Sequence, residues 1–153
     1  MKTRIIKVLA LAAALLTLSG CAAKAAPDLR QVLEAITEQT ELPAMAELSE
    51  KRMADRCGFS PETMLQAVVL VSQDGMRCDE IWLVEAPDEE KAEAVRTAAE
   101  NRAAQLCREL KDYLPDQYAV AEKARIVRKG TVTALFIGPE AETMETILLD
   151  AMR

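Results

Sequence analysis

The chain has 153 residues, of which half are apolar but only 3% aromatic, and its formal net charge is −6. This length suits a single ordinary domain, and the acidic balance disfavours nucleic acid as a partner because it would repel phosphates. The sequence contains no histidine, which disfavours most familiar hydrolase and metalloenzyme designs, since histidine is the commonest general base and metal ligand.

The first 20 residues have the pattern of a secretion signal. Three basic residues precede an apolar run over residues 8–18, and this run is too short to cross a bilayer as a helix. The next tetrapeptide, Leu-Ser-Gly-Cys, resembles the bacterial lipobox. We therefore expect cleavage between Gly20 and Cys21, with Cys21 carrying diacylglycerol and fatty acids such as palmitate.

The expected organisation is a signal peptide over residues 1–20, a lipidated tether over 21–27 and a single domain over 28–153. Removal of the signal leaves 16 basic residues against 25 acidic ones, a charge of −9. Two or three acyl chains give stable anchoring. The mature protein is therefore predicted to lie at the cell membrane, facing outside the cytoplasm.

Two short helices are predicted at the start of the domain. Asp28 and Gln31 have the spacing of a capping box, and apolar residues then recur at helical spacing to about Thr40. After a proline, Met45, Leu48 and Met53 suggest a second helical piece, which ends where a glycine follows Cys57.

The central part of the chain predicts two strands and a long helix. Strands are expected over residues 65–71 and 80–85, joined by a turn with Asp-Gly chemistry. A helix should run from Pro87 to about Tyr113, with one narrow stripe of mainly small residues. The stripe consists of Ala92, Val95, Ala99, Ala103, Leu106, Leu110 and Tyr113.

The last third of the chain predicts a hairpin and a closing helix. Its strands are expected over residues 125–128 and 131–137, around a Lys-Gly turn, and the helix over residues 140–152. The predicted fold class is therefore α+β: an antiparallel sheet of about four strands, formed by two hairpins, packed against a long central helix and N- and C-terminal helices.

Three cysteines remain after Cys21. Cys57 and Cys78 lie near the ends of predicted elements and are candidates for a disulfide, which is permissible outside the cytoplasm. The alternative is that Cys57, Cys78 and Cys107 are small buried residues. No Cys-x-x-Cys spacing occurs, so neither a zinc site nor another metal site is expected.

Asp79, Glu80 and Trp82 are the candidate ligand or partner surface. Alternation along a strand places Asp79 and Glu80 on opposite faces, where they could bind a ligand or cation, or form a solvated strand entry. Trp82 is the only tryptophan and could line a pocket or pack in the core. No catalytic or cofactor-binding motif is recognised, so we expect a nonenzymatic protein without a cofactor.

Several segments together resemble one family. They are the Cys-Gly-Phe-Ser-Pro-Glu turn from Cys57, the Asp79-Glu80-Ile81 strand entry, the end of the long helix at Tyr113-Leu114-Pro115, and the closing hairpin and helix. This order resembles the small bacterial lipoproteins of the domain of unknown function 4358 family, although Cys57 and Ser60 depart from its usual pattern. The resemblance implies an anchored envelope protein and brings no activity.

The leading functional expectation is a noncatalytic binding or adaptor module of the cell envelope, bound to the membrane through Cys21 and recognising a protein or small ligand. One alternative is an envelope enzyme that uses carboxylates such as Asp79 and Glu80 or a thiol such as Cys78. Another is a purely structural envelope lipoprotein.

Overall fold

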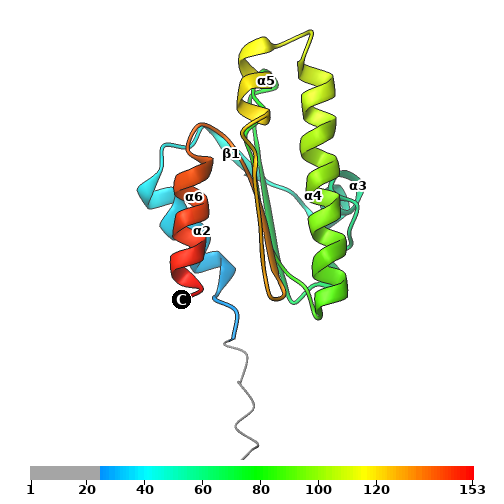
Figure 1. Ribbon diagram of the computed structural model, residues 1–153, viewed down its shortest axis with the longest axis vertical. Helices are drawn as coiled ribbons and strands as arrows, with labels where there is room; N and C mark the ends of the chain where they lie inside the picture. The colour runs from blue at the N-terminus through cyan, green and yellow to red at the C-terminus, as the bar shows by residue number, and fades with distance from the viewer. Residues whose placement is uncertain (1–24) are drawn as a thin grey trace, which may run out of the picture.

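A five-stranded antiparallel sheet separates two layers of helices in the computed structural model, which describes residues 25–153 (Figure 1). The spatial order of the strands is β1-β2-β3-β5-β4. The strands are β1 (Met45–Glu47), β2 (Gln66–Ser72), β3 (Glu80–Glu85), β4 (Arg125–Lys129) and β5 (Val132–Ile137). This confirms the predicted α+β class with its two hairpins, and adds β1 as a short edge strand.

The helices cover both faces of the sheet. Helices α2 (Leu29–Gln39) and α6 (Ala141–Ala151) lie together on one face, and α4 (Glu89–Leu110) lies on the other with α3 (Glu50–Cys57) beside it (Figure 1). A short helix, α5 (Pro115–Ala121), follows α4, and a single 3₁₀ turn, η1 (Pro61–Thr63), precedes β2. The signal peptide and the Cys21 attachment site predicted from the sequence lie outside the described residues.

Strict alternation along the central strands divides the core into two clusters. Trp82 on β3 packs into the cluster under α4, whereas its neighbours Ile81 and Leu83 pack into the cluster under α2 and α6. Strands buried on both faces need apolar residues at nearly every position, which explains the continuous apolar runs of β3 and β5. Trp82 is therefore a core residue, with 1% of its surface exposed.

Side-chain caps and small residues account for the helices. Asp28 accepts hydrogen bonds from the backbone N–H groups of Arg30 and Gln31 and starts α2, as predicted. Asp88 does the same for α4 through the N–H of Lys91. The Thr133 hydroxyl on β5 donates to the Ala92 carbonyl at 3.1 Å, a contact that the small residues of the α4 stripe permit.

Two local predictions differ from the structure, and one helix was not predicted. Residues 45–47 form β1 rather than part of a helix, because their backbone pairs with residues 70–72 of β2. Helix α4 ends at Leu110, short of Tyr113, and residues 115–121 form the unpredicted α5. Proline at the first position of α5 both stops the preceding helix and suits the start of the next one.

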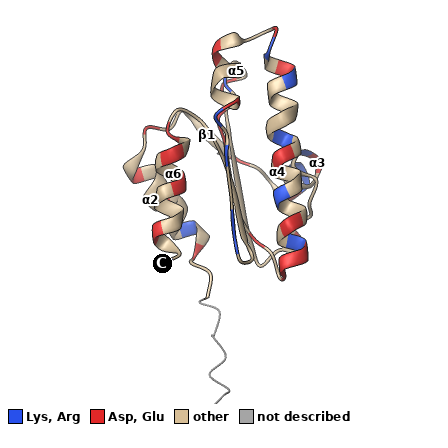
Figure 2. Ribbon diagram, in the orientation of Figure 1, with Lys and Arg blue, Asp and Glu red and all other residues tan. Residues whose placement is uncertain are grey.

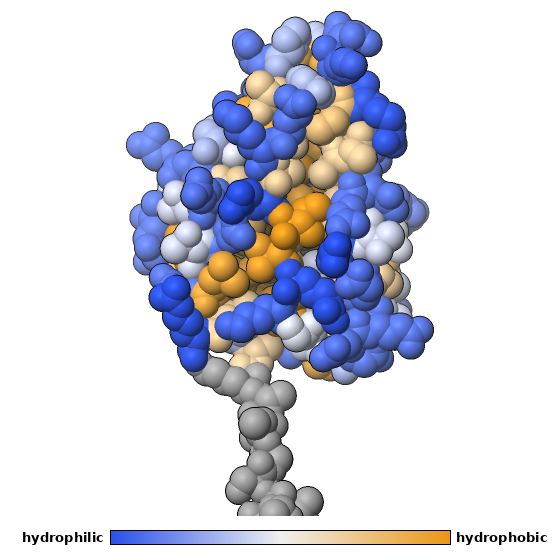
Figure 3. Space-filling view, in the orientation of Figure 1, coloured by the Kyte–Doolittle hydropathy of each residue, from blue (hydrophilic) through white to orange (hydrophobic). Residues whose placement is uncertain are grey.

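Charge is unevenly distributed over these layers. Acidic side chains gather on α2 and α6, whereas basic side chains follow β4 (Figure 2). Figure 3 shows apolar groups reaching the surface between the two helical layers, surrounded by hydrophilic residues. Arg125, Arg128 and Lys129 on the edge strand oppose pairing with the edge of another sheet, because like charges would meet. Within residues 25–153, no helix is both long and apolar enough to span a membrane.

Candidate functional site

Glu80 is the centre of a buried polar cluster on the α4 face of the sheet. Its carboxylate, 1% exposed, accepts hydrogen bonds from Arg102 (Nη2 at 2.9 Å and Nε at 3.2 Å), from Arg56 Nη2 at 3.0 Å and from Trp82 Nε1 at 2.7 Å. Arg102 is itself only 8% exposed. A buried ion needs such a complete set of partners, since burial without them is costly.

Three elements bring this cluster together. Glu80 is the first residue of β3, and Trp82 lies two positions along on the same face. Arg102 belongs to the buried side of α4, where the small stripe residues let the helix approach the sheet. Arg56 lies in the last turn of α3, so the cluster fixes both helices to the strand that they cover.

The cluster carries a net positive charge. Burial alone would raise the pKa of Glu80, but the hydrogen bonds and charges of Arg102 and Arg56 outweigh it and hold the pKa below its ordinary value. Glu80 is therefore ionised at neutral pH, and its single negative charge is shared by two guanidinium groups. One positive charge remains uncompensated within this group of residues.

Asp79 faces the opposite side of the sheet, as the alternation predicted. Its carboxylate, 4% exposed, accepts hydrogen bonds from Arg77 Nε at 2.9 Å and Nη2 at 3.0 Å. It also lies against Gly138, where an added Cβ would come within 3.2 Å of Asp79 Oδ1. The interpretation of Asp79 and Glu80 as a solvated strand entry is thus wrong, because both are buried and paired with arginine.

A polar cleft of about 480 Å³ lies over this cluster, between α3, α4 and the segment that joins β2 to β3. Four arginines line it: Arg52, Arg56, Arg77 and Arg102. Three acidic residues also line it: Asp74, Asp79 and Glu109. Such a concentration of guanidinium groups contrasts with the acidic balance of the chain as a whole.

The cysteines are free thiols in the described residues. The disulfide considered between Cys57 and Cys78 is not formed, and Cys107 is also free. Burial raises the pKa of Cys57 to about 12 and that of Cys78 to about 11. The Cys78 Sγ donates to the Gln117 carbonyl at 3.4 Å, and its backbone N–H donates to Gln117 Oε1 at 3.0 Å, so Cys78 ties the start of β3 to α5.

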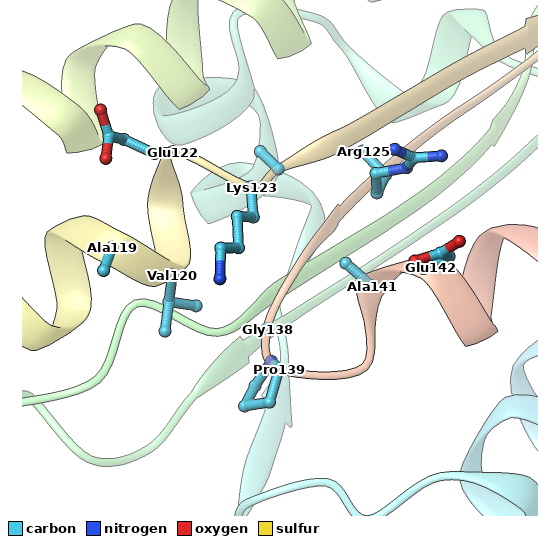
Figure 4. A pocket seen from close by; sticks show the side chains of 10 residues that line it. Ala119, Val120, Glu122, Lys123, Arg125, Gly138, Pro139, Ala141 and Glu142 are labelled. Atoms are coloured by element: carbon cyan, nitrogen blue, oxygen red, sulfur yellow. The ribbon is translucent and has the colours of Figure 1, made fainter.

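A second hollow, of about 540 Å³, lies between α5, the start of β4 and the turn before α6. Figure 4 shows the side chain of Lys123 pointing into it between Val120 and Pro139, whereas Glu122 points away. Lys123 is exposed, and Arg125 is paired with Glu145. This hollow holds fewer converging charged groups than the arginine cleft, which is therefore the better candidate site.

None of the four cleft arginines was singled out from the sequence. Arg102 left a signal there, because it continues the helical spacing of the buried residues Val95, Ala99 and Leu106 on α4. A charged residue inside an apolar stripe requires a buried partner. Arg52, Arg56 and Arg77 left no comparable signal, since exposed arginines are common on short helices and loops.

Fold and cleft together define a small α+β domain with a polar, arginine-lined recess between α3, α4 and the segment that joins β2 to β3. The family described as Domain of unknown function (DUF4358) matches residues 38–138, and the chain belongs to this family. The matched range contains the whole cleft. No curated protein and no solved structure matches the chain.

Proposed function

We propose that this protein is a membrane-anchored, extracytoplasmic lipoprotein and that its domain is a noncatalytic binding or adaptor module of the cell envelope, with the arginine cleft as its binding site. The observation that carries the binding role is that four arginines line one recess, two of them held by the buried carboxylate of Glu80. Clefts that combine shape with a few convergent polar groups are the usual form of small-molecule sites.

The position of the cleft supports this proposal. The Gln66 amide, at the start of β2, donates to the carbonyl of Pro27, so the described chain begins beside that end of the strand. The cleft lies beyond Ser72, at the other end of β2. At about 3.3 Å per residue the two ends are about 20 Å apart. An anchor at Cys21 would thus leave the cleft directed away from the membrane.

The local chemistry favours binding over catalysis. The carboxylates of Asp79 and Glu80 lie on opposite faces, and each is neutralised by arginine. The raised pKa of Cys78, about 11, keeps its thiol protonated at neutral pH, and a protonated thiol is a poor nucleophile. An envelope enzyme that uses these groups would need them ionisable and directed at one substrate.

The anchor is tested by metabolic labelling with an alkyne-bearing palmitate analogue in cells that express the full chain or its Cys21→Ser variant. We expect label and membrane association in the parent protein only. Labelling of the Cys21→Ser variant, or membrane association that does not depend on Cys21, would contradict the anchoring proposal.

The binding role is tested by native mass spectrometry of the lipoprotein extracted gently from its own membrane. We expect a discrete additional mass, from a small molecule or an envelope protein, that disappears when Arg52 and Arg56 are both replaced by glutamine. A lipidated chain that carries nothing in repeated preparations, together with envelope defects on loss of the protein, would instead favour a purely structural role.

A further inference from the structure

We propose that the cleft binds a compact small molecule bearing carboxylate or phosphate oxyanions, through the guanidinium groups of Arg52, Arg56 and Arg102. This inference rests on the proposed binding function and adds the chemical class of the ligand. Guanidinium groups present several N–H donors in a planar fork that matches the spacing of carboxylate and phosphate oxygens.

The arginines retain unused donors after all their internal bonds are made. Within residues 25–153, Arg102 uses Nε and Nη2 for Glu80, so its Nη1 donates no hydrogen bond to the protein. Arg56 uses only Nη2. Arg52 lines the cleft without any ion pair to the described part of the chain.

The internal pairs also hold these donors in place. The carboxylate of Glu80 fixes Arg102 and Arg56, so little freedom of these two side chains is lost when a ligand binds. Preorganisation of this kind improves affinity because the ordering has already been achieved on folding. The bond from Trp82 Nε1 to Glu80 in turn fixes the carboxylate that orients two of the arginines.

The charges of the whole cleft balance, because Asp74, Asp79, Glu109 and the underlying Glu80 offset the four arginines. An anion is favoured locally, where Arg56 and Arg102 share the single carboxylate of Glu80 and Arg52 lies nearby on α3. Asp79 and Glu80 are already paired with arginine, and no group of three or more cysteine or acidic side chains among the described residues could hold a metal ion. The other two carboxylates bond to neutral groups, which do not offset their charge: Asp74 accepts from the Met76 N–H, and Glu109 accepts from the Gln105 amide.

Asp74 and Glu109 also limit the kind of anion. They line the cleft together with the arginines, so a long polyanion that extends past the cleft would meet negative charge. The volume of about 480 Å³ is in the range of small-molecule sites. A compact molecule with two or three oxyanionic groups therefore fits better than a nucleic acid or an anionic polymer.

Trp82 supplies a built-in reporter because it is the only tryptophan of the chain. Its indole N–H donates to Glu80 Oε1, and Glu80 is bonded to Arg56 and Arg102. In the full chain, solubilised in detergent and labelled with ¹⁵N-tryptophan, the indole therefore gives a single NMR signal that senses the floor of the cleft. Inorganic phosphate, pyrophosphate and citrate are titrated at constant ionic strength, with chloride as the reference salt.

We expect the indole signal to shift saturably with at least one of the three anions, at concentrations up to about 10 mM. The phosphate and citrate arms distinguish a phosphate-bearing ligand from a polycarboxylate. Calorimetric titration of the same samples should give the same dissociation constant.

The variant that tests the site is Arg52→Gln with Arg56→Gln. Glu80 keeps Arg102 as its partner in this variant, so the fold should persist, and its retention is checked by circular dichroism. The matched control is Arg30→Gln with Arg96→Gln, which removes the same charge from exposed arginines outside the cleft. The dissociation constant should rise at least about tenfold in the cleft variant and stay unchanged in the control, because only the first loses charged donors to the ligand.

The inference would be overturned if none of the three anions gave either a heat of binding or a saturable shift of the indole signal. It would also be overturned if the dissociation constant rose equally in the control variant. These outcomes remain distinct from failure of the binding role itself. If mass spectrometry finds a neutral or cationic molecule that is lost in the cleft variant, the binding function stands and the oxyanion assignment is wrong.

Discussion

Replacement of Glu80 by glutamine is the sharpest test of the buried cluster. The amide side chain of the variant would keep an oxygen that can accept from the Trp82 indole, but it would leave the Arg102 guanidinium, 8% exposed, without its counter-ion. Loss of one member of a buried ion pair costs about 3 to 5 kcal/mol, because a charge remains in a poorly solvating environment. For a domain of this size we expect the melting temperature to fall by about 10 °C or more.

The matched control is Glu47→Gln, which breaks the pair between Glu47 and Arg30. That pair has good geometry, but its side chains are 42% and 56% exposed. An exposed pair contributes less than about 1 kcal/mol because water solvates both partners after it is broken. Chemical denaturation of both variants, followed by far-UV circular dichroism, measures the difference in the free energy of unfolding.

Addition of Arg102→Leu to Glu80→Gln should restore most of the lost stability. The double variant removes the stranded charge and places an apolar side chain against the core, and such replacements of buried ion pairs are often neutral or stabilising. The reasoning would be refuted if Glu80→Gln cost no more than Glu47→Gln, or if the double variant were less stable than the single one.

The effect of Glu80→Gln should also depend on pH in one direction. Because the pKa of Glu80 is lowered in the folded protein, its ionised form stabilises the fold above the ordinary glutamate pKa of about 4.3. This contribution is lost as the pH falls through the lower pKa of the folded state. The stability difference between the parent protein and Glu80→Gln should therefore shrink below about pH 4, and a constant difference down to pH 2 would contradict this assignment.

Three further predictions concern the end of α3, the cap of α4 and two buried thiols. Gly58→Ala should cost about 1 kcal/mol because Gly58 ends α3 with φ at +74°, whereas Gly75→Ala, in open space without a positive φ, should cost nothing measurable by denaturation. Asp88→Ala should destabilise the protein by about 1 kcal/mol through loss of the α4 cap, and an unchanged denaturation midpoint would exclude that role. Cys57 and Cys78 should resist iodoacetamide at pH 8 and react after unfolding, because their raised pKa values keep the thiols protonated. Alkylation of both thiols in the folded chain, detected by mass spectrometry, would contradict these raised pKa values.

The sequence predicted the elements whose signals repeat over many residues. The strands β2, β3 and β5 have continuous apolar runs, and α4 has a stripe that spans about five turns, so their type was clear. The strand β1 has three residues, too few for a period to show, and its conformation depends on pairing with β2. The short α5 was missed for the same reason of length, although Pro115 is well suited to a first helical position.

The candidate site was predicted only in part. Asp79, Glu80 and Trp82 drew attention as unusual residues at a strand entry, and Glu80 and Trp82 do belong to the buried cluster. Their partners come from positions 22 residues or more away in the sequence, on α3 and α4. No local pattern reports such contacts, so the sequence left open whether the carboxylates face solvent, cations or arginine.

The contribution of the Glu80 cluster to the stability of the fold does not by itself explain why the protein has buried charges there. A buried charged group loses its hydration, and an apolar core of the same volume would often be as stable or more stable. What apolar residues could not supply is orientation, because Glu80 holds two guanidinium groups at the floor of a cleft. Of the two carboxylates that first suggested a binding site, Glu80 thus serves, in our interpretation, as a positioning residue, and the arginines that it holds would meet the ligand.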